Sequence, residues 1–484
     1  MPDDNQHLDN LKPRRRSRWV KLLGGLVVVL ILLLAVALVF DATGQACLRR
    51  ALDEARAIGG PVTLAELQDA RRSWPEDRNG ALVILSIKPR LAGLDKEQGV
   101  DKLPLLGKPE MPRLGRRWSN EIDKEVASHL KGLSHELATI DRLKEFDGGR
   151  FPLTIAANPL ETLLPDLSIL RASIRLKNLQ TTYHAMHAQT ETLADDVTIM
   201  LRHGQLLADE PTMVSALLHV ACAALAIDTV ERICSITPVA PEQLSRIEQF
   251  MATVGSENRI DMGLRGERGT FIGACDYFRN TGSLGRDTPR GMPPPKLPGV
   301  RGWLMRDQAA GIRMFNPLVR ACENPRKALD EAKVLDQEKE RTSRFYLLSN
   351  LLVPSSLARG LELDLKTTAM AQSAQVALAS ERYRLSKGRF PERLDQLVPE
   401  FIEKVPADPF DGKPLRYHLE VDALVVYSVG EDMKDDGGNL RRDPKDNTNL
   451  RDWGFVLLKP EYRGLPAEEV VPATQESSTT APSR

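Results

Sequence analysis

Two histidines, His184 and His187, have the spacing that comes nearest to a metal site in this chain. They are three residues apart on a predicted helix, so they lie on one face, and such a pair can ligate a transition metal. No third ligand with supporting spacing follows nearby. The pair therefore indicates either part of a metal site or, as the simpler interpretation, a surface pair whose hydrogen bonds are only partly satisfied.

Motifs of the common catalytic sites do not occur in the sequence. His135-Glu136 is not followed by the second histidine of a zinc-protease helix, and there is no G-x-S-x-G elbow, no G-x-x-x-x-G-K loop and no dinucleotide fingerprint. In the predicted helix around 263–268, we expect the glycines to allow close packing, and Glu267 and Arg268 to form internal ion pairs. Catalytic groups can converge from distant positions, so these observations lower the expectation of an enzyme without excluding one.

The segment 380–439 has the densest turn chemistry of the chain. A helix is predicted to end at Gly388, because glycine accepts the positive φ of a C-terminal cap. An alternating apolar run at 415–419 and a β-branched and aromatic run at 424–429 are separated by a tight reversal and predict a β-hairpin. An acidic, glycine-rich loop follows at 430–438.

This segment resembles the C-terminal half of the major pseudopilin of type II secretion systems. The residues that match in order and spacing are Tyr383, Gly388, Phe390-Pro391, Leu397-Val398-Pro399, Val405-Pro406, Asp408-Pro409-Phe410, Gly412, Pro414, Tyr417, Tyr427-Ser428, Gly430, Asp432 and Gly437-Gly438. The resemblance implies a small α+β module with a hairpin over about 363–440. The rest of the chain resembles no family of known function.

The resemblance also implies a calcium site, because the corresponding loop of the pseudopilins holds a calcium ion. Asp432 would be a ligand, and Asp435 or Asp436 matches less closely. Calcium takes about six to eight oxygen ligands, which clustered carboxylates and loop carbonyls can supply. The alternative is a solvated acidic turn whose glycines serve only the backbone.

The N-terminal part of the chain departs from the pseudopilin pattern. A pseudopilin begins with a short leader, a cleavage site and a glutamate early in its apolar helix, whereas here basic residues precede an apolar run without any acid. We therefore expect a chain that is not processed or polymerised as a pilin, with the module reused on another protein.

The apolar run 22–40 carries no charge and is long enough to cross a hydrocarbon core of about 30 Å as a helix. Six basic residues precede it: Lys12, Arg14, Arg15, Arg16, Arg18 and Lys21. The positive-inside rule places that end in the cytoplasm and the bulk of the chain in the periplasm or outside the cell. The alternative is a cleaved signal peptide, which the length of the run disfavours because signal peptides carry about 7–15 apolar residues. We expect a single-pass anchor in the lipid bilayer.

The amino-acid composition narrows the functional and structural classes to which the protein can belong. Lys and Arg together number 66, as do Asp and Glu, so no basic excess points to nucleic acid. Aromatic residues make up only 5%, and helices should dominate. The cysteines contain no C-x-x-C pair and are expected to be mainly small buried apolar residues; they are Cys47, Cys222, Cys234, Cys275 and Cys322.

The predicted fold class is mainly α, with a transmembrane helix, an irregular antiparallel helical bundle or short solenoid, and the small C-terminal α+β module. The predicted divisions are a basic cytoplasmic tail (1–21), the anchor (22–40), a helical domain (46–280), a Pro/Gly-rich linker (281–300), a helical connector (301–362), the module (363–460) and a disordered tail (461–484). Local signals predict a capping box at Thr63, a helix over 121–143 and a helix N-cap at Asp209.

Two functional hypotheses follow. The first is a non-enzymatic, membrane-anchored scaffold that faces the exterior or periplasm and binds protein partners, which the pseudopilin resemblance implies are those of a secretion or pilus-like system. The second is an envelope hydrolase with a site in the helical bundle, metal-assisted through His184 and His187.

Overall fold

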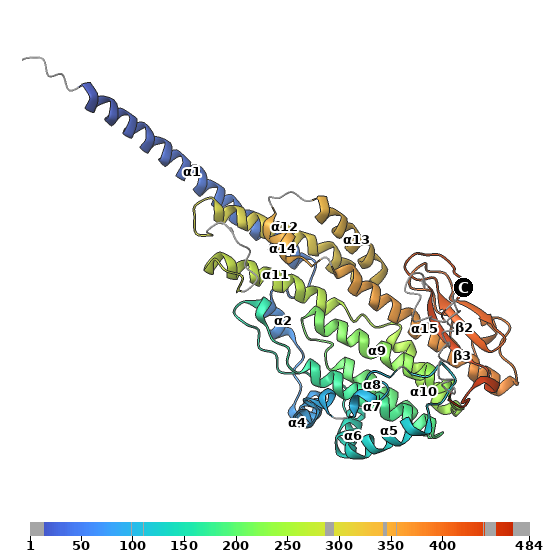
Figure 1. Ribbon diagram of the computed structural model, residues 1–484. Helices are drawn as coiled ribbons and strands as arrows, with labels where there is room; N and C mark the ends of the chain where they lie inside the picture. The colour runs from blue at the N-terminus through green and yellow to red at the C-terminus, as the bar shows by residue number, and fades with distance from the viewer. Residues whose placement is uncertain are drawn as a thin grey trace, which may run out of the picture.

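The structure is a computed structural model that describes residues 14–97, 99–109, 111–285, 295–341, 346–354, 356–438, 440 and 452–467. It confirms a mainly helical chain with an N-terminal apolar helix and a small antiparallel sheet in the C-terminal region. A long helix leaves one end of the helical body, and the sheet lies at the other end (Figure 1).

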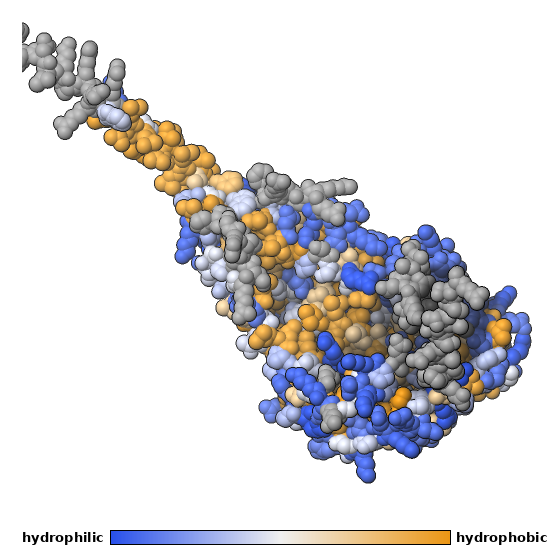
Figure 2. Space-filling view, viewed as in Figure 1, coloured by the Kyte–Doolittle hydropathy of each residue, from blue (hydrophilic) through white to orange (hydrophobic). Residues whose placement is uncertain are grey.

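The long helix, α1 (Arg14–Ala57), runs without interruption from the basic residues through the apolar run into the body. Large apolar side chains from Trp19 to Val39 are exposed, and Figure 2 shows this part as an apolar rod outside the body. From Asp41 on, α1 packs along α12 (Val300–Ala321), and Leu48, Ala51 and Ala55 are buried there. The apolar helix therefore continues without a break through residues 46–57 into the body.

The other helices of the body are mostly short in the first third and long thereafter. Their bounds are α2 (Leu64–Ala70), α3 (Gly80–Ser86), α4 (Lys88–Leu91), α5 (Asn120–Gly132), α6 (Ser134–Asp141), α7 (Leu167–Met186), α8 (Leu193–Gln205), α9 (Met213–Cys234), α10 (Pro241–Val254), α11 (Asp261–Thr281), α13 (Pro325–Arg341), α14 (Leu347–Leu352) and α15 (Leu357–Lys387).

Local capping signals were partly correct. The capping box is confirmed, since the Thr63 side chain accepts from Glu66 N while the Glu66 side chain accepts from Thr63 N. The N-cap predicted at Asp209 is wrong: Thr212 caps α9, and Asp209 accepts instead from Arg71. The helix predicted over 121–143 is interrupted at Leu133, which separates α5 from α6.

Helix α9 contributes buried side chains to three hydrophobic cores of the body. Its Met213 and Val220 belong to a core with α1, α11, α12 and α15, whereas Cys222 joins a second core and Val230 a third. Among the described residues two helices are apolar and long enough to cross a membrane, Trp19–Ala57 of α1 and α9. The apolar window of α9 is 67% buried and that of α1 is 0% buried, so α9 is a core helix of the body.

The sheet contains β1 (Arg416–Leu419), β2 (Ala423–Ser428) and β3 (Trp453–Leu458), antiparallel in the order β1-β2-β3. The predicted hairpin is confirmed by the β1–β2 register, and β3 is a strand that the sequence did not predict. One face of the sheet packs on α15 within the third core, and the side chains of the other face form a fourth cluster with Leu114 and Tyr462. Because both faces are covered, β2 is buried along its whole length.

Some predicted segments fall wholly or partly outside the described residues. These include 1–13 of the basic tail and 286–294 of the linker. The disorder predicted from 461 is wrong for 461–467, where Leu465 N donates to the carbonyl oxygen of Gly115 and Arg117 N donates to that of Leu465. Residues 468–484 also lie outside the description.

Candidate functional site

His184 lines a pocket of about 390 Å³ where α5, α6 and α7 meet. The residues that line it are Ala127, Leu130, Lys131, Ser134, Leu137, Ala138, Asp141, Gln180, Tyr183 and His184. Burial lowers the pKa of His184 below its usual value, while the nearby charge of Asp196 acts in the opposite direction. A neutral imidazole on the wall of a pocket can accept a proton, which is the role of a general base.

The polar groups beside His184 are held by a buried lysine. Lys177 is 1% exposed and donates to Asp141 Oδ1 at 2.6 Å and to Gln180 Oε1 at 2.8 Å, and it lies 2.8 Å from Asp196 Oδ1. The lysine therefore pairs with two carboxylates, one of which lines the pocket. No sequence pattern signals this group, because its members come from three separate helices.

His187 points to a different set of partners. Its Nε2 lies 3.1 Å from Asp123 Oδ1, which also accepts from Trp118 Nε1 at 2.8 Å, and its ring lies 4.5 Å from that of Tyr183. In the described part of the chain, no three His, Cys, Asp or Glu side chains converge in a way that could hold a metal ion. The simpler interpretation, a surface histidine with partly satisfied hydrogen bonds, describes His187, whose side chain is 40% exposed.

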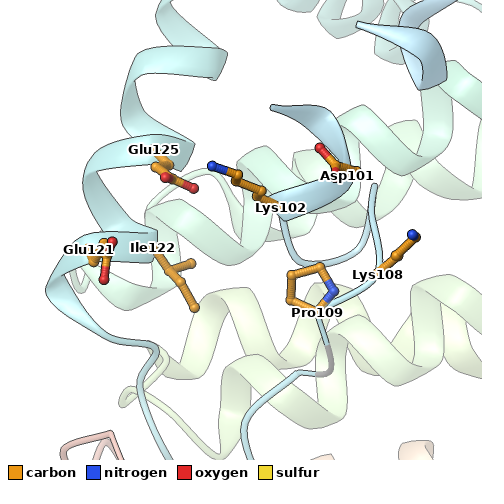
Figure 3. Close-up of a pocket in the computed structure, with 7 residues that line it drawn as sticks. All are labelled: Asp101, Lys102, Lys108, Pro109, Glu121, Ile122 and Glu125. Carbon is orange, nitrogen blue, oxygen red and sulfur yellow. The ribbon is translucent and has the colours of Figure 1, made fainter. Parts of the chain in front are cut away.

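A second hollow of about 480 Å³ lies between α5 and the loop that precedes it (Figure 3). Glu121 and Glu125 extend from α5, Lys102 points toward Glu125, and Asp101 and Lys108 complete the charged lining. Its charges are mixed and it contains no histidine or nucleophilic side chain, so its lining indicates no particular reaction.

A buried aspartate from an earlier turn, Asp408, holds the start of the acidic loop that follows β2. Asp408 Oδ1 accepts from Phe410 N at 2.8 Å and from Ser428 Oγ at 2.7 Å, and its Oδ2 accepts from Val429 N at 3.0 Å and from Arg416 Nη1 at 2.7 Å. This one side chain joins the turn after it to the end of β2. The Asp-Pro-Phe segment thus has a structural role that its sequence alone does not show.

The three predicted calcium ligands take different places in that loop. Asp435 Oδ1 accepts from Tyr427 OH at 2.9 Å and from Gly437 N at 3.0 Å, whereas Asp432 Oδ1 accepts from Lys434 N at 3.1 Å. The negative charges of Asp435 and Asp436 both lie close enough to Asp452 to raise its pKa. The structure therefore places Asp435 and Asp436 near Asp452.

Asp452, immediately before β3, is the acidic residue that the sequence did not predict. It is 4% exposed, its Oδ2 accepts from Gly438 N at 2.8 Å, and its Oδ1 is buried with no hydrogen-bond partner. Burial above all, and then the charges of Asp436 and Asp435, raises the pKa of Asp452 to about 6. In the described residues these three carboxylates do not converge closely enough to form a ready metal site. A cation that drew them together would supply the counter-charge that the buried Oδ1 of Asp452 lacks.

A serine and a histidine form a second polar pair deep in the body. His203 Nδ1 donates to the carbonyl oxygen of Ile199 at 2.8 Å, which leaves Nε2 to accept from Ser173 Oγ at 2.8 Å. Both side chains are 0% exposed, and burial lowers the pKa of His203 to about 4. The pair has the atoms of a nucleophile and its base, but substrate has no access to it, and it joins α7 to α8.

The predicted role of the glycine-rich part of α11 is half right. A Cβ on Gly266 would overlap the backbone of Pro211, so this glycine does allow close packing. The ion pair predicted for Arg268 is wrong: its guanidinium is 0% exposed, Nη2 donates to the carbonyl oxygen of Pro61 at 3.2 Å, and Nε and Nη1 have no partner. Arg259, by contrast, donates to the buried Asp364 at 2.7 Å.

Comparisons with known proteins were made for the whole chain. No protein family, curated protein or solved structure matches it. Function must therefore be inferred from the geometry above.

Proposed function

We propose that this protein is a single-pass membrane protein whose helical body, on the exterior or periplasmic side, is a non-enzymatic scaffold for protein partners. The observation that carries the proposal is the exposed apolar stretch of α1, whose side chains pack on nothing in the described chain between Trp19 and Val36. Exposed apolar surface of that length is costly in water and is stable in a bilayer. The basic residues before it favour a cytoplasmic N-terminus.

The arrangement of the body suits a scaffold held at the membrane. Asp41 Oδ1 accepts from Gly299 N at 3.0 Å and from Gly302 N at 2.6 Å, so α1 itself caps α12. The anchor and the body therefore share one rigid helix rather than a flexible linker. The C-terminal module lies at the end of the body away from the exposed part of α1 (Figure 1). We infer that it is a docking head, and its likeness to the pseudopilins points to partners in a secretion or pilus-like system.

Reporter fusions after residue 484 test this proposal. Alkaline phosphatase, which folds only outside the cytoplasm, should be active in the fusion, and green fluorescent protein exported by the same route should be dark. The intact protein should stay in the membrane pellet after extraction at alkaline pH. A fusion whose phosphatase is inactive while the fluorescent protein shines would contradict the proposed orientation, and extraction into the soluble fraction would contradict the anchor.

The proposal includes a calcium ion in the C-terminal module. Asp435, Asp436 and Asp452 would supply carboxylate oxygens, and the orphaned Oδ1 of Asp452 supports this assignment. Bound calcium would supply counter-charge that ties the acidic loop to the start of β3. Asp432, the ligand implied by the pseudopilin resemblance, has the weaker support from geometry.

A second candidate function, an envelope hydrolase, is favoured by one observation: the neutral His184 in its pocket beside Asp141. A panel of ester and amide substrates should then be hydrolysed, and His184→Gln should lose about 10²-fold or more of that rate. His135→Gln is the matched control, because His135 is exposed on α6. Metal analysis of the purified protein tests the metal-assisted version, and a protein without hydrolysis and without transition metal would remove this candidate.

A further inference from the structure

Helix α12 runs parallel to α1, with its N-terminal end toward the apolar run. At that end, a Cβ on Gly299 would lie 3.4 Å from the Cβ of Ala37. Further along both helices, Arg313 Nε lies 2.7 Å from Glu54 Oε2. The second contact lies closer to the C-terminal end of both helices than the first, so the two helices run in the same direction. The start of α12 therefore faces the membrane side of the body.

The depth of this contact follows from the length of the anchor. The run 22–40 is only just long enough to cross a hydrocarbon core of about 30 Å, so all of it is needed for the span. Ala37 precedes the end of that run at Phe40 by three residues, or about 4.5 Å of helix. Gly299, which lies against Ala37, therefore reaches at least the headgroup layer of the leaflet from which α1 emerges.

The residues around Gly299 have the chemistry of a membrane interface. Leu297 is 52% exposed at the tip, and Pro298 beside it is exposed as well. Lys296 and Arg301 flank them with exposed cationic side chains. Apolar side chains between cations are typical of segments that insert in the acyl boundary while their charges meet phosphates.

We propose that the tip of the body, residues 295–301, is a second membrane contact, seated in the headgroup layer of an anionic bilayer. Leu297 enters the acyl boundary, and Lys296 and Arg301 bind lipid phosphates. The inference rests on the proposed anchoring of 22–40, and it adds a specific orientation, because two contacts on one face prevent the body from tilting freely about α1.

Depth-dependent quenching in lipid nanodiscs tests this contact in the full-length chain. Single cysteines at Leu297→Cys, Leu30→Cys and Val421→Cys are labelled with a nitrobenzoxadiazole dye in a Cys47→Ser background, because the other cysteines are buried. The nanodiscs contain phosphatidylglycerol with nitroxide on the headgroup or deep in the acyl chain. Val421 is the control, since it is 82% exposed in the turn between β1 and β2, at the far end of the body.

The label at position 297 should lose most of its fluorescence with headgroup nitroxide, the label at 30 with deep nitroxide, and the label at 421 with neither. Quenching at 30 with no quenching at 297 would overturn this inference and leave the anchor intact. If the label at 30 is not quenched either, both the anchor and this contact are overturned.

A charge-reversal variant tests the contact of Lys296 and Arg301 with lipid phosphates. Lys296→Glu with Arg301→Glu should reduce quenching at 297, whereas Arg389→Glu with Arg393→Glu, a charge reversal on the far module, should not. Unchanged quenching in the first variant would overturn the phosphate contact.

Discussion

Gly44 of α1 and Gly302 of α12 face each other without any side chain between them. A Cβ on Gly44 would overlap the carbonyl oxygen of Gly302, and a Cβ on Gly302 would lie 2.6 Å from the carbonyl oxygen of Phe40. The atoms on the other side are backbone atoms, which cannot rotate away. This contact fixes how α1 enters the body.

Gly302→Ala should therefore destabilise the body, because the two helices must separate to admit a methyl group. We expect a loss of about 1–3 kcal/mol in the free energy of unfolding, the range for overpacking a tight contact. Chemical unfolding of the chain in mild detergent measures it. Gly132→Ala is the matched control: nothing lies within 4 Å of a Cβ at that position in α5, so stability should hold or rise slightly. Equal stability of both variants would contradict the backbone contact.

Calcium should raise the melting temperature of the detergent-solubilised chain relative to chelator, because a ligand that binds only the folded state stabilises it, by about 2.7 kcal/mol at a hundred times the dissociation constant. Asp452→Asn should abolish the shift, and the exposed Asp395→Asn should retain it. Asp432→Asn separates the two assignments, since loss of the shift there would favour the pseudopilin pattern. No shift at millimolar calcium in the wild type would remove the site.

The buried His203 should make the protein less stable in mild acid. Burial lowers its pKa from 6.5 to about 4 in the folded state. The unfolded chain therefore binds a proton on this residue below pH 6.5 while the folded chain does not until about pH 4, so stability is lost as pH falls through that window. The contribution between pH 7 and pH 5 is about 2 kcal/mol.

Urea unfolding at the two pH values measures this effect. His203→Gln should flatten the decline, although its stability at pH 7 is lower because the fit to Ser173 changes. The exposed His135→Gln should leave the decline as in the wild type. A decline that is the same in all three proteins would contradict the assignment to His203.

Two buried arginines should respond oppositely to removal of their charge. Arg259→Met leaves Asp364 buried without its partner, and we expect a loss of about 3–5 kcal/mol. Arg268→Met removes a guanidinium whose Nε and Nη1 have no partner and whose pKa burial lowers to about 10. This second change should be nearly neutral or stabilising. Thermal unfolding of both variants compares them, and a large loss from Arg268→Met would show that this charge has a partner in solution.

What the sequence by itself determined is local. The uncharged run 22–40 consists of consecutive residues of one helix. The capping box at Thr63, the C-terminal cap at Gly388 and the β1–β2 hairpin each depend on residues within one helix turn or one reversal of the chain. Neighbouring residues carry enough information to specify such elements, because the interactions that form them are made along the chain itself.

What only the tertiary structure decided depends on residues far apart in the chain. Asp452 meets Asp435 and Asp436 only when β3 joins the sheet, and Ser173 meets His203 only when α7 packs on α8. Asp41 caps α12 through Gly299 and Gly302, which lie 258 and 261 residues further along the chain. Each of these contacts forms because apolar faces from distant segments are buried together, and that burial brings polar groups into contact whose separation in the sequence carries no pattern.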